Sequence, residues 1–184
     1  EKYAPWIRRV YIVTDDQTPA WLDTSNPRVR VVSHREIMPA EILPVFSSTV
    51  IEWFLPYIPD LAEHFLYAND DMFFSRPVDP GFFFDRQGRP IVRLKVQSLK
   101  KHDDDIYCHM ILRMQNLVRE RYGRCSSLAP HHNVDAYRRS DFLECCETFQ
   151  AELEHTKHAR FRSRDDWQRA LVLYYALARG RASL

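Results

Sequence analysis

The sequence predicts an α/β protein: a twisted mixed sheet with helices packed on it, followed by a mainly helical C-terminal half. Two observations predict this fold class. Runs of β-branched and aromatic residues at positions 9–14, 28–32 and 65–74 are typical of strands. From about residue 104 onward, apolar residues recur with helical spacing instead. The 184 residues are enough for one domain with a real core.

The first two strand-like runs are separated by polar and proline-rich punctuation. The run at 9–14 ends at Asp15 and Asp16, which begin a loop, and residues 18–22 begin like a short helix. After the second run, we expect residues 34–39 to form a connecting turn.

A short helix is expected to begin at Ser48 or Thr49. Thr49 and Glu52 have the spacing of a capping box, in which Glu52 reaches back to the cap, and Pro56 limits the helix. Its buried stripe should consist of Ile51, Phe54, Leu55 and Ile58.

The apolar run at 65–74, expected to be a buried strand, is interrupted by Asn69, Asp70 and Asp71. Carboxylates do not lie in an apolar core without partners or a metal. In open α/β sheets, ligands bind at the carboxyl ends of strands, and Mg²⁺ prefers carboxylate and phosphate oxygens. The three residues therefore either hold a divalent metal against a phosphorylated substrate or form a turn in which Asn69 and Asp70 cap backbone groups.

The remaining elements change from strand to helix. Residues 86–89 indicate a hairpin-type turn into an alternating edge strand at 91–96. Helices are then expected at 104–122, with Asp103, Asp104 and Asp105 at its positive end, at 140–158, capped by Ser140, and from Ser163 onward.

Composition excludes several classes of function. The 26 Lys and Arg residues nearly balance 25 acids, so no strong field favours nucleic acid. The four glycines are far apart in the sequence, so it contains no glycine-rich phosphate-binding motif. There is no apolar run long enough for a membrane span. The four cysteines lack metal or disulfide spacing, which favours a reducing compartment or inert core thiols.

Two polar stretches in the second half offer chemistry beside the acids. His131, His132 and Asn133 follow a proline in an irregular segment, and one imidazole can act as a general base or bind phosphate. Adjacent residues rarely point the same way, so we expect only one histidine to act; the alternative is a pair of surface histidines. The basic stretch at 160–164 precedes an expected helix start, which suits either phosphate binding or a solvated linker.

Together these groups fit phosphoryl transfer, in which catalysis consists mostly of positioning and charge neutralisation. Glu52 also fits as an acceptor of a sugar hydroxyl, although its spacing favours the capping box.

These residues resemble the Stealth family of sugar-1-phosphate transferases. That family includes bacterial capsular polysaccharide phosphotransferases and the catalytic subunit of the lysosomal-enzyme N-acetylglucosamine-1-phosphotransferase. The family's central block is similar to four parts of this chain: residues 6–15, Ser48 with Glu52, residues 58–61 and residues 65–73. The third block is similar to residues 129–133. The fourth block is similar to residues 160–163 with Asp166 and Gln168.

The family's first block, a strand ending in Trp-Val-Asp-Gly that helps to bind the nucleotide sugar, would lie before Glu1. We therefore expect residues 1–184 to form a single catalytic-type domain that is a fragment of a longer chain. Its α/β part would be 1–100 and its mainly helical part 101–184. The resemblance implies a Rossmann-type sheet like that of nucleotide-sugar transferases.

The resemblance further implies that a hexose-1-phosphate moves from a nucleotide-sugar donor to a glycan hydroxyl, forming a phosphodiester of a capsule or cell-surface polysaccharide. Asp70 and Asp71 would bind Mg²⁺ (or Mn²⁺), His131 or His132 would be the base or a phosphate ligand, and Arg162 would neutralise developing charge. Substrate would be bound by Ser48, Glu52, Asn69, Asn133 and Gln168. The expected location is cytoplasmic, with peripheral association at the inner face of the bacterial membrane.

Two alternatives stay open. A metal-dependent glycosyltransferase would use the same acids, but its leaving group would be the nucleoside diphosphate. A non-catalytic carbohydrate-binding protein would fit the missing first block.

Overall fold

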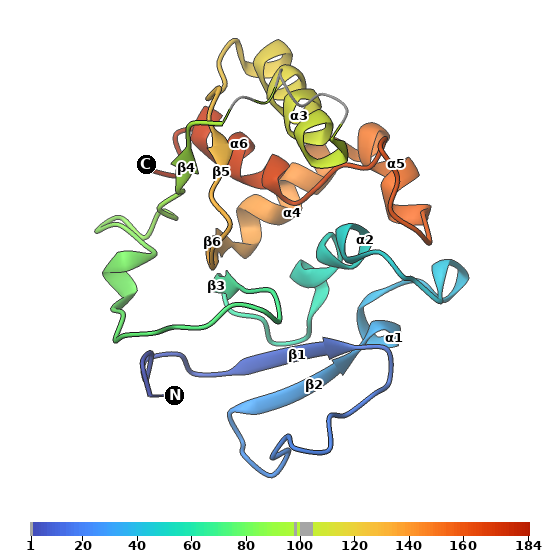
Figure 1. Cartoon of the computed structure of the whole chain (residues 1–184), viewed down its shortest axis with the longest axis vertical. Helices are drawn as coiled ribbons and strands as arrows, with labels where there is room; N and C mark the ends of the chain where they lie inside the picture. Colours follow the sequence, from blue (N-terminus) through green and yellow to red (C-terminus); the bar gives the residue numbers. More distant parts are fainter. Residues whose placement is uncertain (1, 98, 100–104) are drawn as a thin grey trace.

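The computed structural model describes residues 2–97, 99 and 105–184 and has a mixed α/β fold that becomes mainly helical toward the C-terminus (Figure 1). The strands pair two by two, as β1–β2, β3–β6 and β4–β5, and not as one continuous sheet within the described residues. The expected order of an α/β first half and a helical second half is therefore confirmed at this coarser level.

β1 (Val10–Thr14) and β2 (Val29–Ser33) are parallel, paired from Val10 with Val29 to Thr14 with Ser33. Both strands lie where the sequence predicts them. Because they run in the same direction, the residues that follow them emerge at one end. There the carboxylate of Asp16 accepts hydrogen bonds from the Ser33 hydroxyl and from Arg35 Nε, the latter at 2.8 Å.

Two short segments around these strands differ from expectation. Residues 34–39 are not a simple turn, since α1 (His34–Ile37) begins there with a complete capping box between Ser33 and Glu36. Conversely, residues 18–22 are a turn and not a helix, closed by Leu22 N donating to Pro19 O at 2.9 Å.

α2 (Ser48–Glu52) begins at the predicted position and lies between two 3₁₀ turns, η1 (Ala40–Ile42) and η2 (Leu55–Tyr57). Its N-cap is Ser47, whose side chain makes no capping bond, so the third helical residue is Val50 and not Glu52. The expected capping box between Thr49 and Glu52 is therefore wrong, and the Glu52 carboxylate is available for other contacts.

β3 (His64–Tyr67) pairs antiparallel with β6 (Asp135–Arg138), from His64 with Arg138 to Tyr67 with Asp135. The predicted strand at 65–74 is thus correct only up to Tyr67. Beyond it the chain turns at Asn69, whose carbonyl accepts from Met72 N at 3.2 Å. Phe73 is 86% exposed and Phe74 is half-buried against Phe83, so the apolar residues after the acids do not extend the strand.

Residues 80–95 form an irregular hairpin. η3 (Pro80–Phe82) leads into a bridge between Phe84 and Pro90, with Gly88 at φ +73° in the turn. The predicted hairpin-type turn is confirmed, but the expected strand at 91–96 is reduced to β4 (Leu94–Lys95). β4 pairs antiparallel with β5 (Ala129–Pro130).

The helical half begins with α3 (Ile106–Tyr122), which Asp105 caps by accepting from Cys108 N at 2.9 Å. Asp103 and Asp104 lie outside the described residues. The single helix expected at 140–158 is two helices, α4 (Arg139–Thr148) and α5 (Gln150–His158), which meet at the buried Phe149.

The last helix, α6 (Ala170–Ala178), starts later than predicted. Ser163 and Asp166 do form the expected cap-like contact, with Ser163 N donating to Asp166 Oδ2 at 2.7 Å, but it closes a turn and not a helix. None of the described helices combines the length and the apolar character needed to cross a membrane.

The core is continuous from β2 to the C-terminal helix. Its largest side chains with under 2% exposure include Trp53, Tyr137, Phe142, Phe149, Tyr174 and Tyr175. The cysteines are free thiols, and Cys108, Cys145 and Cys146 are buried in this core. That outcome agrees with the expectation of inert core thiols.

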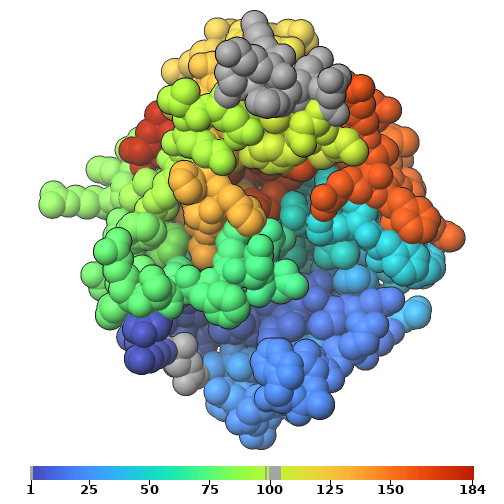
Figure 2. All heavy atoms as spheres, in the orientation of Figure 1, coloured from blue at the N-terminus to red at the C-terminus, as the bar shows by residue number. Residues whose placement is uncertain are grey.

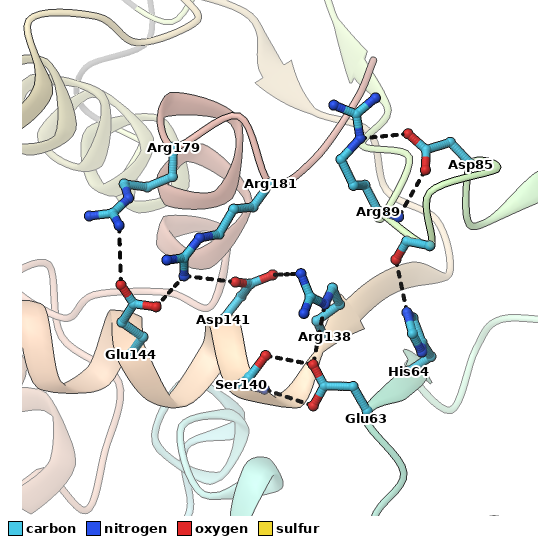
Figure 3. Close-up of polar contacts among 11 residues, drawn as sticks. Glu63, His64, Asp85, Arg89, Arg138, Ser140, Asp141, Glu144, Arg179 and Arg181 are labelled. Carbon is cyan, nitrogen blue, oxygen red and sulfur yellow. Dashed lines mark hydrogen bonds and ion pairs between the residues drawn. The ribbon is translucent and has the colours of Figure 1, made fainter.

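A chain of ion pairs fixes the start of α4 against neighbouring segments (Figure 3). Ser140, expected to cap this helix with its own side chain, instead donates its hydroxyl to Glu63 Oε1 at 2.5 Å, while Ser140 N donates to Glu63 Oε2 at 3.2 Å. Arg138 joins Glu63 to Asp141 (3.2 and 3.6 Å), and Arg181 binds Asp141 at 3.0 Å. Glu63 thus caps α4 from the preceding β3 connection.

Candidate active site

Polar groups from both halves of the chain converge on a hollow in the surface. Figure 2 shows this hollow bordered by the segments around residue 50 (cyan), residue 70 (green), residue 130 (gold) and residue 160 (orange). These segments contain most of the residues that the sequence singles out, so their contacts can be followed one by one.

Glu52, the last residue of α2, points toward β3 and the C-terminal helix. Its side chain is only 13% exposed, and Oε1 accepts a hydrogen bond from the Tyr67 hydroxyl at 2.9 Å. Oε2 lies 3.5 Å from Arg169 Nε. Burial raises the pKa of Glu52 above its usual value, although the charge of Arg169 opposes that shift.

Arg169 is the centre of the buried polar cluster. Its guanidinium, 13% exposed, forms an ion pair with Asp135 and donates to the Tyr137 hydroxyl at 2.7 Å. The same guanidinium lies over the Tyr67 ring, 4.1 Å from the centroid. One cation therefore serves two carboxylates, those of Glu52 and Asp135.

Asp135 opens β6 and is buried opposite Tyr67 of β3. Burial raises its pKa, and the positive charges of Arg169 and Arg93 act in the opposite direction. Because Asp135 follows Asn133 by two residues, its ion pair with Arg169 fixes the end of the segment that carries the histidines.

The histidine loop meets the Asn69 turn. Asn69 Nδ2 lies 3.3 Å from His132 Nε2, which joins two residues predicted independently. His131 N donates to the Arg93 carbonyl at 2.9 Å, and both histidine side chains are exposed. Asn133 Nδ2 is a buried donor without a hydrogen-bond partner among the described residues, and it lies one residue beyond His132.

Arg162 and Ser48 lie on the opposite border of the hollow. Arg162 Nη2 donates to Ser48 Oγ at 2.5 Å, joining positions 114 residues apart in the sequence. The charge of Arg162 also opposes the rise in the pKa of Glu52. Gln168 is half-buried next to Arg169, and its carbonyl accepts from Leu171 N at 3.0 Å, so the structure gives it a backbone role at the start of α6.

Asp70 and Asp71 are exposed in the turn after Asn69. Within the described ranges, no group of three or more His, Cys, Asp or Glu side chains is arranged to hold a metal ion. Two exposed carboxylates fit Mg²⁺ nevertheless, because that ion keeps several waters and binds through one or two carboxylates plus substrate phosphates.

The structure therefore brings Ser48, Glu52, Asn69, His132 and Arg162 to one region, with Asp70 and Asp71 in the adjoining turn. It also adds Tyr67, Asp135 and Arg169, which sequence reasoning missed. Tyr67 stood in a run assigned to apolar packing. Asp135 and Arg169 carried no motif, and only their pairing across the fold gives them significance.

A separate cavity of about 340 Å³ lies between the N-terminal segment, the β1–β2 pair and residues 73–74. Its lining is mostly apolar and includes Tyr3, Ile7, Val10 and Val29. None of the predicted site residues lines it, so it is distinct from the polar cluster.

Comparison with known proteins gives a consistent picture. Residues 1–92 match the family described as Stealth protein CR2, conserved region 2. The chain is 40% identical over 172 residues to the capsular polysaccharide phosphotransferase LcbA of Aeromonas hydrophila, covering 90% of this chain and 47% of that protein.

Two exopolysaccharide phosphotransferases are similar over nearly all of this chain. One, from Lactiplantibacillus plantarum, is 34% identical over 206 residues, covering 96% of this chain and 61% of its own length. The other, from Streptomyces coelicolor, is 40% identical over 187 residues, covering 98% and 35% respectively. The chain thus spans roughly one to two thirds of the length of these relatives.

Proposed function

Because the chain belongs to the Stealth family, we propose that it carries out sugar-1-phosphate transfer in the synthesis of a bacterial capsule or exopolysaccharide. A hexose-1-phosphate moves from a nucleotide-sugar donor to a hydroxyl group of a glycan acceptor, and a phosphodiester forms. The names of the relatives, all polysaccharide phosphotransferases, support this reaction class.

The observation that carries the proposal is the convergence of Glu52, His132 and Arg162 around the buried Arg169–Asp135 pair. These groups come from α2, the loop before β6 and the segment before α6. An imidazole, carboxylates and guanidinium groups around one hollow suit a reaction that needs proton transfer and charge neutralisation.

In the proposed reaction the acceptor oxygen attacks the phosphorus that bears the sugar. The bond from that phosphorus to the oxygen of the nucleoside monophosphate breaks, and the proton of the acceptor hydroxyl passes to a base. We assign His132 as the base because its Nε2 lies 3.3 Å from Asn69 Nδ2, beside the turn that carries the two acids. Arg162, fixed by Ser48, neutralises charge that develops on the phosphoryl oxygens. Glu52 and Asn69 orient the sugar or the acceptor hydroxyl.

Asp70 and Asp71 would hold Mg²⁺ or Mn²⁺, which would neutralise the donor diphosphate when bound. Their exposure leaves both carboxylates accessible to a metal that arrives with its substrate. The proposal includes a cytoplasmic location with peripheral association at the inner face of the membrane, since the donor is a water-soluble nucleotide and the product is a surface polysaccharide.

The proposal also concerns the fold. A parallel pair such as β1–β2 is rarely stable with open faces, because parallel sheets are normally covered on both sides. We therefore propose that β1–β2 belongs to a larger Rossmann-type sheet and that residues 1–184 are part of one catalytic domain.

The reaction is tested by ³¹P NMR of the full-length protein with Mg²⁺, a uridine-diphosphate sugar and a glycan acceptor. Growth of nucleoside monophosphate together with a new phosphodiester resonance is expected. Growth of nucleoside diphosphate instead would identify a glycosyltransferase and overturn the proposal. Failure to consume any member of a panel of nucleotide sugars, while the sugars still bind, would favour the non-catalytic alternative.

A further inference from the structure

Two phenylalanine rings are stacked on each other at the surface beside the site. Phe46 and Phe161 are 65% and 68% exposed, their ring centroids are 5.4 Å apart, and their planes differ by only 16°. We call these two rings the aromatic pair. Large apolar side chains grouped at the surface frequently mark a binding site.

The two segments that carry the aromatic pair are hydrogen-bonded to each other. Phe46 N donates to Arg160 O at 2.8 Å, and two residues further along, Arg162 donates to Ser48. These two bonds join the segment before α2 to the segment after α5. One backbone bond and one side-chain bond therefore fix the two segments to each other before a ligand binds, which lowers the entropy cost of binding.

The aromatic pair lies on the border of the hollow. Phe161 immediately precedes Arg162, and Phe46 lies two residues before Ser48, so the rings adjoin the bond that fixes Arg162. Figure 2 shows the two segments side by side on this border, near residue 46 (blue-cyan) and residue 160 (orange). A ligand that spans from the hollow to the rings would contact both.

The charge beside the rings is positive. Arg160 and Arg162 flank Phe161 and are exposed, and Arg160 has no ion-pair partner in the part of the chain that the structure describes. A ligand for this surface should therefore present both a flat apolar face and a negative charge. A phosphodiester-linked saccharide has both, since a pyranose ring exposes a face of C–H groups and each linkage carries one negative charge.

We propose that the aromatic pair, with Arg160, binds a sugar and its phosphodiester in the growing polysaccharide that serves as acceptor. This inference rests on the proposed function, because that reaction makes a phosphodiester-linked chain. We place the reacting hydroxyl of the acceptor one unit from the rings, on the side of Arg162, which follows Phe161 in the chain and bonds to Ser48. The nucleotide-sugar donor does not contact the aromatic pair.

The first test measures binding directly in the full-length protein. The probes are three trisaccharides joined by phosphodiesters and built from glucose, N-acetylglucosamine or N-acetylmannosamine, each paired with the same trisaccharide joined by glycosidic bonds. By saturation-transfer NMR, at least one phosphodiester probe should bind. Phe161→Ala and Phe46→Ala should each weaken it by about tenfold, and Arg160→Gln should remove the preference over the glycosidic partner.

Trp21→Ala is the matched control, since Trp21 is 81% exposed and lies in the loop between β1 and β2. It should leave binding unchanged. The inference would be overturned if no phosphodiester probe bound the wild-type protein. It would also be overturned if Phe46→Ala and Phe161→Ala bound the probe as tightly as the wild-type protein does. A third result would also overturn it: the wild-type protein sediments with phosphatidylglycerol vesicles and the same two variants do not. That result would mean that the rings bind the membrane.

The second test separates this inference from the proposed function. In the transferase assay, Phe161→Ala should raise the KM for acceptor by about tenfold while the KM for donor and kcat change by less than about twofold. An unchanged acceptor KM would overturn the inference and leave the transferase proposal intact. A wild-type protein that binds the probe through the aromatic pair but transfers no phosphate would overturn only the proposed reaction.

Discussion

Glu52 illustrates how one residue acquires a role that its spacing in the sequence does not suggest. The pattern from Thr49 to Glu52 predicts a capping box with Thr49 as the N-cap, but the N-cap is Ser47, two residues earlier. The carboxylate is therefore free to meet Tyr67 and Arg169 inside the fold. A buried carboxylate that does not cap a helix should contribute to activity more than to stability.

Glu52→Gln tests that conclusion. We expect transferase activity to fall by at least about 100-fold, while the free energy of unfolding at pH 7 changes by less than about 1 kcal/mol. Steady-state kinetics and urea unfolding measure the two effects. If Glu52→Gln loses stability but keeps its activity, the role of Glu52 is structural and the prediction is wrong.

The same substitution has a pH signature. Because the pKa of Glu52 is raised in the folded protein, its protonated form is favoured by folding. Its contribution to stability is thus fully present below the unfolded pKa of about 4.5 and is lost as the pH rises through the folded pKa. Between pH 4.5 and 7, the stability of Glu52→Gln should therefore fall less steeply than that of the wild-type protein.

Asp71 is the residue on which the metal assignment depends most. Asp71→Asn keeps the size of the side chain but removes a charge, so activity should fall by about 100-fold or more with the fold intact. The Mg²⁺ concentration for half-maximal rate should rise. Asp79→Asn, another exposed acid, is the control and should behave like the wild-type protein. Unchanged activity and metal dependence in Asp71→Asn would refute the assignment.

The two adjacent histidines can be separated by substitution. The His132 side chain contacts Asn69, and no such contact is seen for the His131 side chain among the described residues. His132→Ala should therefore lower kcat by about 100-fold or more, and His131→Ala by less than about tenfold. Circular dichroism checks that both variants fold. The reverse order of effects would assign the base to His131.

At the scale of elements, the start of α4 depends on a residue from another segment. Glu63 accepts from both the backbone N and the hydroxyl of Ser140, and it pairs with Arg138 (Figure 3). Sequence reasoning assigned the cap to Ser140 because serine is a common N-cap. The structure has Arg138 at the N-cap, and a capping partner 77 residues away in sequence cannot be read from local spacing.

Glu63→Gln should lower stability by about 1 kcal/mol at pH 7, a typical value for losing a helix cap. The hydrogen bonds from Ser140 and the charge of Arg138 hold the pKa of Glu63 below its usual value, against the effect of burial. Its contribution is therefore present above the unfolded pKa of about 4.5 and is lost as the pH falls through the folded pKa. Urea unfolding at pH 7 and pH 3 should show the variant and the wild type converging at the lower pH; a difference that persists at pH 3 would contradict this.

Elements with strong local signals were predicted well, and those fixed by distant partners were not. β1 and β2 are rich in β-branched residues and lie where expected. β6 was missed because Asp135 to Arg138 alternates poorly, and its strand geometry comes from pairing with β3. α6 starts late because Ser163 and Asp166 satisfy each other within a turn, so a capping pattern is present without a helix.

At the scale of the whole molecule, the site lies between the α/β part of the chain and its mainly helical part. The sequence indicated Glu52, Asn69, His132 and Arg162 as chemically suitable groups, partly through family resemblance. It could not show what places them together. That information is in the contacts of Arg169 with both halves, which no local pattern encodes.

Arg169→Met removes this connection, and its effect should be seen in the stability of the whole chain. The guanidinium binds Glu52 and Tyr67 of the first half and Asp135 and Tyr137 of the second. Without it, two buried carboxylates lose their cation, and breaking a buried pair in this way typically costs about 3 to 5 kcal/mol. Urea unfolding should show that loss in Arg169→Met.

The origin of that loss in stability can be identified by making the same substitution in a variant without the two buried carboxylates. In a protein that already carries Glu52→Gln and Asp135→Asn, the buried charges are gone, so adding Arg169→Met should cost less than about 2 kcal/mol. An equal cost in both backgrounds would mean that Arg169 stabilises the fold through packing of its stem against Tyr67. A smaller cost in the neutral background would mean that the charge of Arg169 holds the two halves together around the site.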